Sequence, residues 1–246
     1  MDDERLKLLR LMQLADSALP VGAAAHSFGL ETLVEEGALD VSTLEAFLAD
    51  YLSEAGAQES AFCRAAHRLA ARVNFGEHDF HLEAWLELNR RLSARRQARE
   101  SRAASATLGR RLLQLARALD CGELLTFASE AARESGVETH HCAAFGLVGG
   151  ALALDEGATA EAYLHQTLAG LVSACQRLMP LGQTRAQQIL WRLKPALVAA
   201  SESGLAGVGA RDGAVETDCD DVFCFTPLLD LGSMRHTSLT TRLFIS

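Results

Sequence analysis

The sequence is dominated by two residue types that favour helices, and this limits the fold more than any other feature. Alanine and leucine supply 42 and 41 of the 246 residues, whereas valine and isoleucine together supply 13. Leucine and alanine lose little conformational freedom in a helix, while β-branched residues are the ones that suit pleated sheets. Only four prolines interrupt the chain, so helices can run long between them. We therefore expect an all-α protein, a single-domain bundle of roughly nine or ten helices.

Hydrophobic periodicity and capping residues place most of these helices. A capping box is predicted at Ser42 to Glu45, where the serine and glutamate side chains would satisfy free backbone amides. Gly37 is expected to end the preceding helix in the left-handed conformation. In the longest predicted helix, a break is expected near Gly109. The predicted ranges are 5–15, 27–36, 42–54, a further helix that ends near Arg72, 80–119, 124–134, 141–154, 160–178 and 183–203.

Three segments stand out in this helical domain, which we take as one unit over 1–246. The run from Gly146 to Gly150 lies inside an apolar helix, where missing side chains let a second helix approach closely. The segment 204–221 contains four glycines and five acidic residues and is expected to be a mobile loop. The segment 222–246 is too apolar to remain in water, so we expect it to be a docking tail.

The sequence lacks the common motifs of nucleotide hydrolysis and acyl transfer. It contains two lysines, Lys7 and Lys194, and neither lies in a G-x-x-x-x-G-K-[ST] loop that would cradle phosphates. No G-x-S-x-G nucleophile elbow is present either. We therefore expect that the protein is not an enzyme and holds no cofactor of its own.

The densest group of potential metal ligands is His140, His141 and Cys142. One hypothesis is a helical metal-dependent enzyme that uses these residues to hold nickel or zinc as a Lewis acid. Three consecutive residues are too few to close such a site. The other interpretation is that the histidines begin a helix and the cysteine lies in the core.

Positive charge is concentrated in 90–117, which contains nine arginines and one acidic residue. Four of these arginines recur at helical spacing and predict one cationic helix face: Arg91, Arg95, Arg99 and Arg102. This face could be solvated, meet an acidic partner or bind nucleic acid. No aromatic residue lies between Trp85 and Phe127 to stack on bases, and the isoelectric point is about 5.4, so we expect no nucleic-acid partner.

Neither a membrane span nor a secretory signal is predicted. The longest nearly uncharged stretch, 140–154, is shorter than the ~20 residues that cross a bilayer. The first residues are acidic, whereas a secretory signal begins with positive charge. We therefore expect a cytoplasmic protein with no membrane partner.

Three segments, taken together and in this order, resemble the signatures of the urease accessory protein F family (UreF). The first is Leu-Pro-Val-Gly at 19–22, followed by Ser-Phe-Gly-Leu-Glu at 27–31. The second is Leu-Val-Ser-Ala at 171–174, followed by Arg-Leu-Met-Pro-Leu-Gly-Gln-Thr at 177–184. The third is Ser-Met-Arg-His at 233–236, with Arg-Leu-Phe at 242–244 and a final serine. One such segment would be weak, but the set covers nearly the whole chain.

The resemblance implies an all-helical, dimeric scaffold in urease maturation. Such a scaffold joins a second accessory protein, UreD (also called UreH), to the GTPase UreG and helps to insert nickel into apo-urease. It performs no covalent chemistry, and nickel passes through the complex. The family's side chains differ at Ala24, Thr237, Thr240 and Ile245. The partner-binding residues that the resemblance implies are Pro20, Gly22, Ser27, Glu31, Pro180, Gly182, Gln183, Arg235, His236, Arg242, Leu243 and Phe244.

Overall fold

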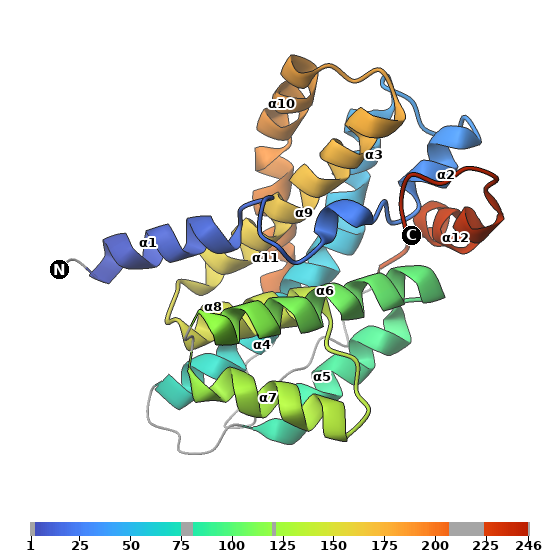
Figure 1. The fold of residues 1–246 in the computed structure, drawn as a ribbon. Helices are drawn as coiled ribbons and strands as arrows, with labels where there is room; N and C mark the ends of the chain where they lie inside the picture. The colour runs from blue at the N-terminus through green and yellow to red at the C-terminus, as the bar shows by residue number, and fades with distance from the viewer. Residues whose placement is uncertain (1–2, 75–80, 120–121, 207–223, 246) are drawn as a thin grey trace.

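The computed structural model describes residues 3–74, 81–119, 122–206 and 224–245. Over these ranges the chain forms twelve α-helices, two 3-10 helices, one π-helical turn and no strand, so the all-α prediction is confirmed (Figure 1). The α-helices are α1 (Asp3–Leu14), α2 (Leu30–Glu35), α3 (Leu44–Tyr51), α4 (Ala57–Asn74), α5 (Leu82–Arg95), α6 (Arg99–Ala118), α7 (Glu123–Glu134), α8 (His141–Ala151), α9 (Glu156–Leu178), α10 (Gln183–Arg192), α11 (Lys194–Ala206) and α12 (Pro227–Arg235). The short elements are η1 (Ala23–Ala25), the π-helical η2 (Leu52–Gly56) and η3 (His236–Ser238).

Helix α8 lies at the centre of the molecule and packs against α4, α6 and α9. Every residue from His141 to Gly150 is buried, as expected for a helix that is apolar on all sides. A Cβ atom on Gly146 would overlap the carbonyl group of Cys63 in α4, and one on Gly150 would overlap the carbonyl oxygen of His67. The prediction of a close helix approach at this glycine run is therefore confirmed.

The predicted helix over 80–119 is two helices, and the break is not at Gly109. Helix α5 ends at Arg95 and α6 begins at Arg99, with Arg96 and Ala98 in extended conformation. The side chain of Arg96 instead reaches Glu59 of α4, with 2.6 Å between Nη2 and Oε1. Gly109 lies inside α6, where its missing side chain leaves room for the backbone of residues 139 and 140. A buried ion pair, not a glycine, thus coincides with the break.

Two further predictions near the chain's second half need correction. The range 183–203 forms α10 and α11, which meet at Leu193 and Lys194. The mobile loop was expected to begin at residue 204, but α11 continues to Ala206. The remainder of the expected loop lies in the segment 207–223, which is outside the described residues. Gly204 belongs to α11, and a Cβ atom there would lie 2.8 Å from the backbone nitrogen of Ala61 in α4. The glycine therefore serves helix packing.

The predicted capping box at Ser42 is wrong, whereas the predicted cap at Gly37 is confirmed. The carboxylate of Asp40 accepts hydrogen bonds from the backbone amides of Ser42 (2.7 Å) and Thr43 (3.0 Å). Asp40 therefore satisfies the free amides ahead of α3, two residues before the predicted cap. Gly37 has φ 70°, and the following amide donates back to the carbonyl of Leu33 across the end of α2.

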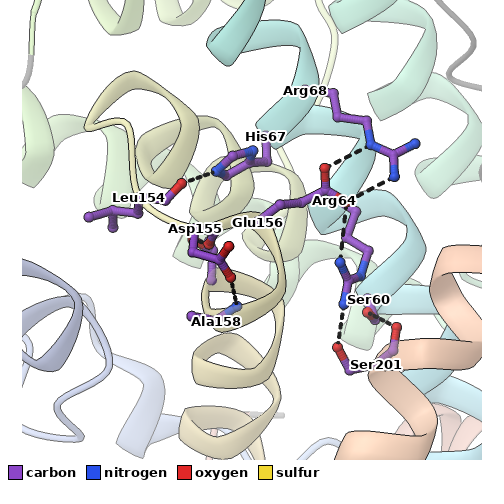
Figure 2. A network of polar contacts seen from close by, with 10 residues as sticks. Ser60, Arg64, His67, Arg68, Leu154, Asp155, Glu156, Ala158 and Ser201 are labelled. Atoms are coloured by element: carbon purple, nitrogen blue, oxygen red, sulfur yellow. Dashed lines mark hydrogen bonds and ion pairs between the residues drawn. The ribbon is translucent and has the colours of Figure 1, made fainter. Parts of the chain in front are cut away.

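A polar cluster joins α4, the start of α9 and α11 (Figure 2). Glu156 accepts hydrogen bonds from Arg68 at 2.8 and 2.9 Å and from Arg64 at 3.2 Å. Arg64 also donates to the hydroxyl of Ser201 in α11 at 2.7 Å. Burial favours the neutral acid, but the two guanidinium groups outweigh it and hold the pKa of Glu156 below its ordinary value. The carboxylate therefore stays ionised and ties these helices together.

Helix α1 projects from the body, with its N-terminal end far from the other helices (Figure 1). Leu14 is its one buried residue, and four large apolar side chains are exposed: Leu6, Leu8, Leu9 and Met12. Among the described helices, none is both long and apolar enough to cross a membrane.

Candidate partner-docking surface

The three segments that carry the family resemblance lie together in the structure. Arg177, near the end of α9, donates a hydrogen bond to the carbonyl of Ala24 at 2.7 Å. The same guanidinium lies over the ring of Phe244, 4.1 Å from its centroid. The backbone amide of Ile245 donates to the carbonyl of Ala25 at 2.9 Å. Segments more than 150 residues apart in the sequence therefore form one continuous structure.

We call residues 224–245 the tail, and its end is held by the carboxylate of Glu31 in α2. The backbone amides of Leu243 and Phe244 donate to Oε1 and Oε2 of Glu31 at 2.6 and 3.3 Å. The ring nitrogen Nε2 of His236 lies 2.7 Å from Oε2. The side chains of Glu31 and His236 are 7% and 1% exposed. Glu31 and His236, both expected from the sequence to meet a partner, therefore contact each other.

Helix α12 of the tail lies against the start of α2 and against α6 (Figure 1). Gly29 has φ 92°, and a Cβ atom there would lie 2.6 Å from the carbonyl oxygen of Leu229 in α12. A Cβ atom on Gly232 would lie 2.7 Å from the carbonyl oxygen of Gly29. The hydroxyls of Ser101 and Ser233 are 2.7 Å apart. Two glycines thus allow backbone contact between the N-terminal segment and the tail.

The outer side of the tail is apolar. Leu228, Leu231 and Met234 of α12 are exposed at helical spacing and form what we call the tail stripe. Leu243 and Ile245 are also exposed, at 63% and 73%. This combination of a fixed backbone and exposed apolar side chains is typical of a protein interaction site.

The twelve residues expected to bind partners differ in how exposed they are. Four are buried against the chain itself: Ser27, Glu31, His236 and Phe244. Seven are exposed: Pro20, Pro180, Gly182, Gln183, Arg235, Arg242 and Leu243. Gly22 is half-buried, with φ 86° beside Arg111. Sequence reasoning gave no role to Arg177. It placed the tail stripe inside the expected docking tail but did not use the helical spacing of the stripe, which could have indicated its exposed face.

Among the exposed residues, Pro180 and Gly182 lie in the connection between α9 and α10, and Gln183 begins α10. Arg235 forms an exposed ion pair at 3.2 Å with Glu36, the residue that follows α2. Exposed pairs of this kind contribute little to stability, so Arg235 remains available to a partner.

The candidate metal ligands are built into the core. His140 precedes α8, and its ring nitrogens lie 2.8 Å from the hydroxyl of Ser93 and 3.2 Å from that of Ser105. Burial lowers the pKa of His140 to about 3 and that of His141 to about 4, and it raises the pKa of Cys142 to about 12. Within the described ranges, no three His, Cys, Asp or Glu side chains are grouped to hold a metal ion. The interpretation as helix start and core is therefore favoured.

These buried histidines predict a pH dependence of stability. A depressed pKa in the folded state means that the unfolded chain binds protons first as the pH falls below about 6.5. The free energy of unfolding should therefore decrease from pH 6.5 towards pH 4, and His141 should contribute on the order of 3 kcal/mol of this loss. Urea unfolding at several pH values should show a flatter profile for His141→Phe. The exposed His81→Gln variant should keep the wild-type profile, and equal profiles for all three proteins would contradict the assignment.

The arginine-rich segment does not form one continuous cationic face. Arg91 and Arg95 lie on α5, whereas Arg99 and Arg102 lie on α6, so the predicted single face is wrong. Several arginines of the segment pair with carboxylates of this chain: Arg90 with Glu83, Arg91 with Glu87, Arg96 with Glu59, Arg102 with Glu138 and Arg117 with Glu130. Internal pairing of this extent disfavours a phosphate-binding surface.

A cavity of about 160 Å³ lies beneath the tail. Glu59 lines this cavity, pairs with Arg96 and accepts a hydrogen bond from Tyr163 at 2.9 Å. His141 Nε2 and Gln166 Oε1 are buried there and have no hydrogen-bond partner among the residues that the structure describes. The tail residues that line this cavity are Cys224, Thr226, Leu229 and Asp230. The tail therefore covers polar groups of the core as well as exposing apolar ones.

The structure is an all-helical domain with exposed apolar side chains on its tail, and comparisons with known proteins identify its family. The sequence profile of UreF matches residues 39–194. The urease accessory protein UreF of Nostoc sp. is 34% identical over 239 residues, which span 97% of this chain and 95% of that protein. The UreF proteins of Actinobacillus pleuropneumoniae and Haemophilus influenzae are 32% and 31% identical, over 96% of this chain and 97% and 94% of their own lengths. The chain therefore belongs to the UreF family of urease accessory proteins.

Proposed function

We propose that this chain is a non-catalytic scaffold that joins UreD to the GTPase UreG during nickel insertion into apo-urease. Its relatives carry the name urease accessory protein, which supports a role in maturation. The observation that carries the proposal is the tail, whose backbone is fixed to the body while its apolar side chains face outward. The nickel is cargo of the complex, and the protein acts in the cytoplasm.

The UreD side of the scaffold is the tail stripe together with Leu243 and Ile245. Exposed apolar side chains lose unfavourable contact with water when a partner covers them. Arg235 and Arg242 lie near these side chains in the sequence and are exposed. Apolar residues bordered by arginine are typical of interface centres. The tail therefore has the composition and the order that a docking site needs.

A second part of the proposal is that this chain binds a GTPase, UreG. This chain has no G-x-x-x-x-G-K-[ST] phosphate-binding loop, which supports a partner such as UreG as the source of nucleotide hydrolysis in the complex. We further propose that the scaffold is a homodimer, as the family resemblance implies. Two copies would present two tails and a shared dimer surface that could hold UreG.

Complex formation tests this function directly. The full chain, the cognate UreD and UreG should be mixed singly and in combination and separated by size-exclusion chromatography with light scattering. We expect UreG to elute with UreD only when this chain is present. Elution of UreG with UreD in its absence, or no complex with either partner, would contradict the bridging role.

A further inference from the structure

We propose that the outer face of α10 and α11 is a second docking surface, and that its occupant is an amphipathic helix of another protein whose apolar stripe is flanked by acidic side chains. The inference goes beyond the bridging function and does not depend on the tail. Six exposed residues define this face, which we call the outer seam: Thr184, Gln188, Trp191, Pro195, Val198 and Glu202.

Helices α10 and α11 form one rod along the side of the molecule. They follow each other end to end, with Leu193 as the residue between them (Figure 1). The amide of Leu197 donates to the carbonyl of Leu193 at 2.9 Å, and the amide of Leu193 donates to the carbonyl of Ile189 at 3.0 Å. Both helices pack on α9. The outer seam therefore lies on one rod and spans about 27 Å from end to end.

The spacing of the outer seam is that of a helix that pairs with another helix. Its residues are separated alternately by four and three positions, which is the heptad pattern of packed helix pairs. On the inner face of the rod, Leu190, Leu193 and Leu197 have the same spacing and are buried in the core. At the middle of the outer seam, Trp191 is 74% exposed and Val198 is 40% exposed. Because tryptophan is strongly enriched at the energetic centre of interfaces, this seam has the side chains that a second helix would cover.

The charges beside the outer seam favour an acidic occupant. The segment 183–201 contains no acidic residue, although the chain contains 32. Arg185, Arg192 and Lys194 directly flank the seam, at the positions where the charges of paired helices meet. Glu45 neutralises part of this charge, since it lies 2.6 Å from Arg192 and 3.7 Å from Arg185. The remaining charge is positive, so a helix with acidic side chains at its own flanking positions is the complementary partner.

A second copy of this chain fits the outer seam less well. In an antiparallel pair each flank meets the same flank of the other copy, so Arg192 and Lys194 would lie beside their own equivalents. In a parallel pair the two copies of Glu202 would meet instead. Like charges at such positions oppose helix pairing. The charge pattern therefore favours a different protein as the occupant.

A pair of designed peptides tests the proposal on the full chain. Both are helices of about three heptads with leucine at the seam positions, and they carry either glutamate or lysine at every flanking position. Trp191 reports binding through its fluorescence, because the other tryptophan, Trp85, is fully buried. We expect the glutamate peptide to shift the emission to shorter wavelength and to bind at least about tenfold more tightly than the lysine peptide. Equal affinities, or no binding of the glutamate peptide, would overturn the proposal.

Three variants locate the contact by fluorescence anisotropy of the labelled peptides. Trp191→Ser should weaken binding of the glutamate peptide at least about tenfold, with unchanged helical circular dichroism. Phe225→Ser is the matched control, because Phe225 is 77% exposed but lies outside the rod, and it should leave binding nearly unchanged. Lys194→Glu should weaken the glutamate peptide and strengthen the lysine peptide, which a loss of folding would not do.

Two results would contradict the location or the occupant. Equal losses in Trp191→Ser and Phe225→Ser would show that the peptide does not bind at the outer seam. A shift of the Trp191 emission when the chain alone is concentrated would show that a second copy covers the seam, and it would overturn the choice of an acidic helix.

Discussion

Gly146→Ala should destabilise the protein strongly, although alanine favours helices more than glycine does. The new methyl group would overlap the carbonyl of Cys63, which is backbone of α4 and cannot rotate away. Relief requires moving α8 from α4, and both helices are buried in the core. Overpacking of this kind commonly costs about 1–3 kcal/mol, and contact with backbone places this site at or above the upper end. We expect a loss of about 3 kcal/mol or more in the free energy of unfolding, measured by urea denaturation.

Gly170→Ala provides the matched control for this prediction. Gly170 also lies inside a helix, α9, and a Cβ atom there would meet nothing within 4 Å. The same substitution should leave stability unchanged or raise it by up to about 1 kcal/mol, because alanine has the higher helix propensity. Equal effects of the two substitutions would show that the close contact between α4 and α8 does not limit stability.

Deletion of Met234 to Ser246 should abolish UreD binding and leave helical circular dichroism nearly unchanged. The deletion removes one residue of the tail stripe, both exposed residues at the tail end and the hydrogen bonds of the tail to Glu31. The helices of the body do not depend on this segment for their backbone hydrogen bonds, so they should persist. We expect affinity to fall at least about a hundredfold, as for the loss of an interface centre. Isothermal titration calorimetry with UreD measures this, and retained binding would refute the docking role.

A pair of point variants separates loss of a docking surface from loss of exposed apolar area in general. Leu228 in the tail stripe and Leu8 in α1 are almost equally exposed, at 56% and 58%. Their helices, α12 and α1, lie at opposite sides of the molecule (Figure 1). Leu228→Ser should weaken UreD binding, whereas Leu8→Ser should not. Equal effects would place the UreD contact elsewhere.

Local sequence signals predicted the features that depend on local physics. The excess of Ala and Leu gave the helical class, and Gly37 gave a helix end because its left-handed conformation needs no distant partner. The break between α5 and α6 was missed because no proline or glycine marks it. There Arg96 pairs with Glu59, which is 37 positions away in the sequence. Hydrophobic periodicity reflects residues that are near each other in the sequence, so it cannot predict an ion pair between distant residues.

At the candidate site, too, the sequence predicted local features but not contacts between distant segments. The order of the three motifs indicated the family, but it could not show that Arg177, Ala24 and Phe244 touch. Motif membership also cannot tell a residue that meets a partner from one that shapes the surface. Glu31 and His236 are buried against each other, whereas Leu243 beside them is exposed. Only the folded backbone distinguishes these cases.

Activation of apo-urease in a reconstituted system tests the central claim most directly. Purified apo-urease, UreD, UreG, GTP and nickel should be incubated with and without this chain, and urease activity should be followed over time. The scaffold role predicts nickel-dependent activation with the chain and activity near background without it. Equal activation when the chain is omitted would contradict the account.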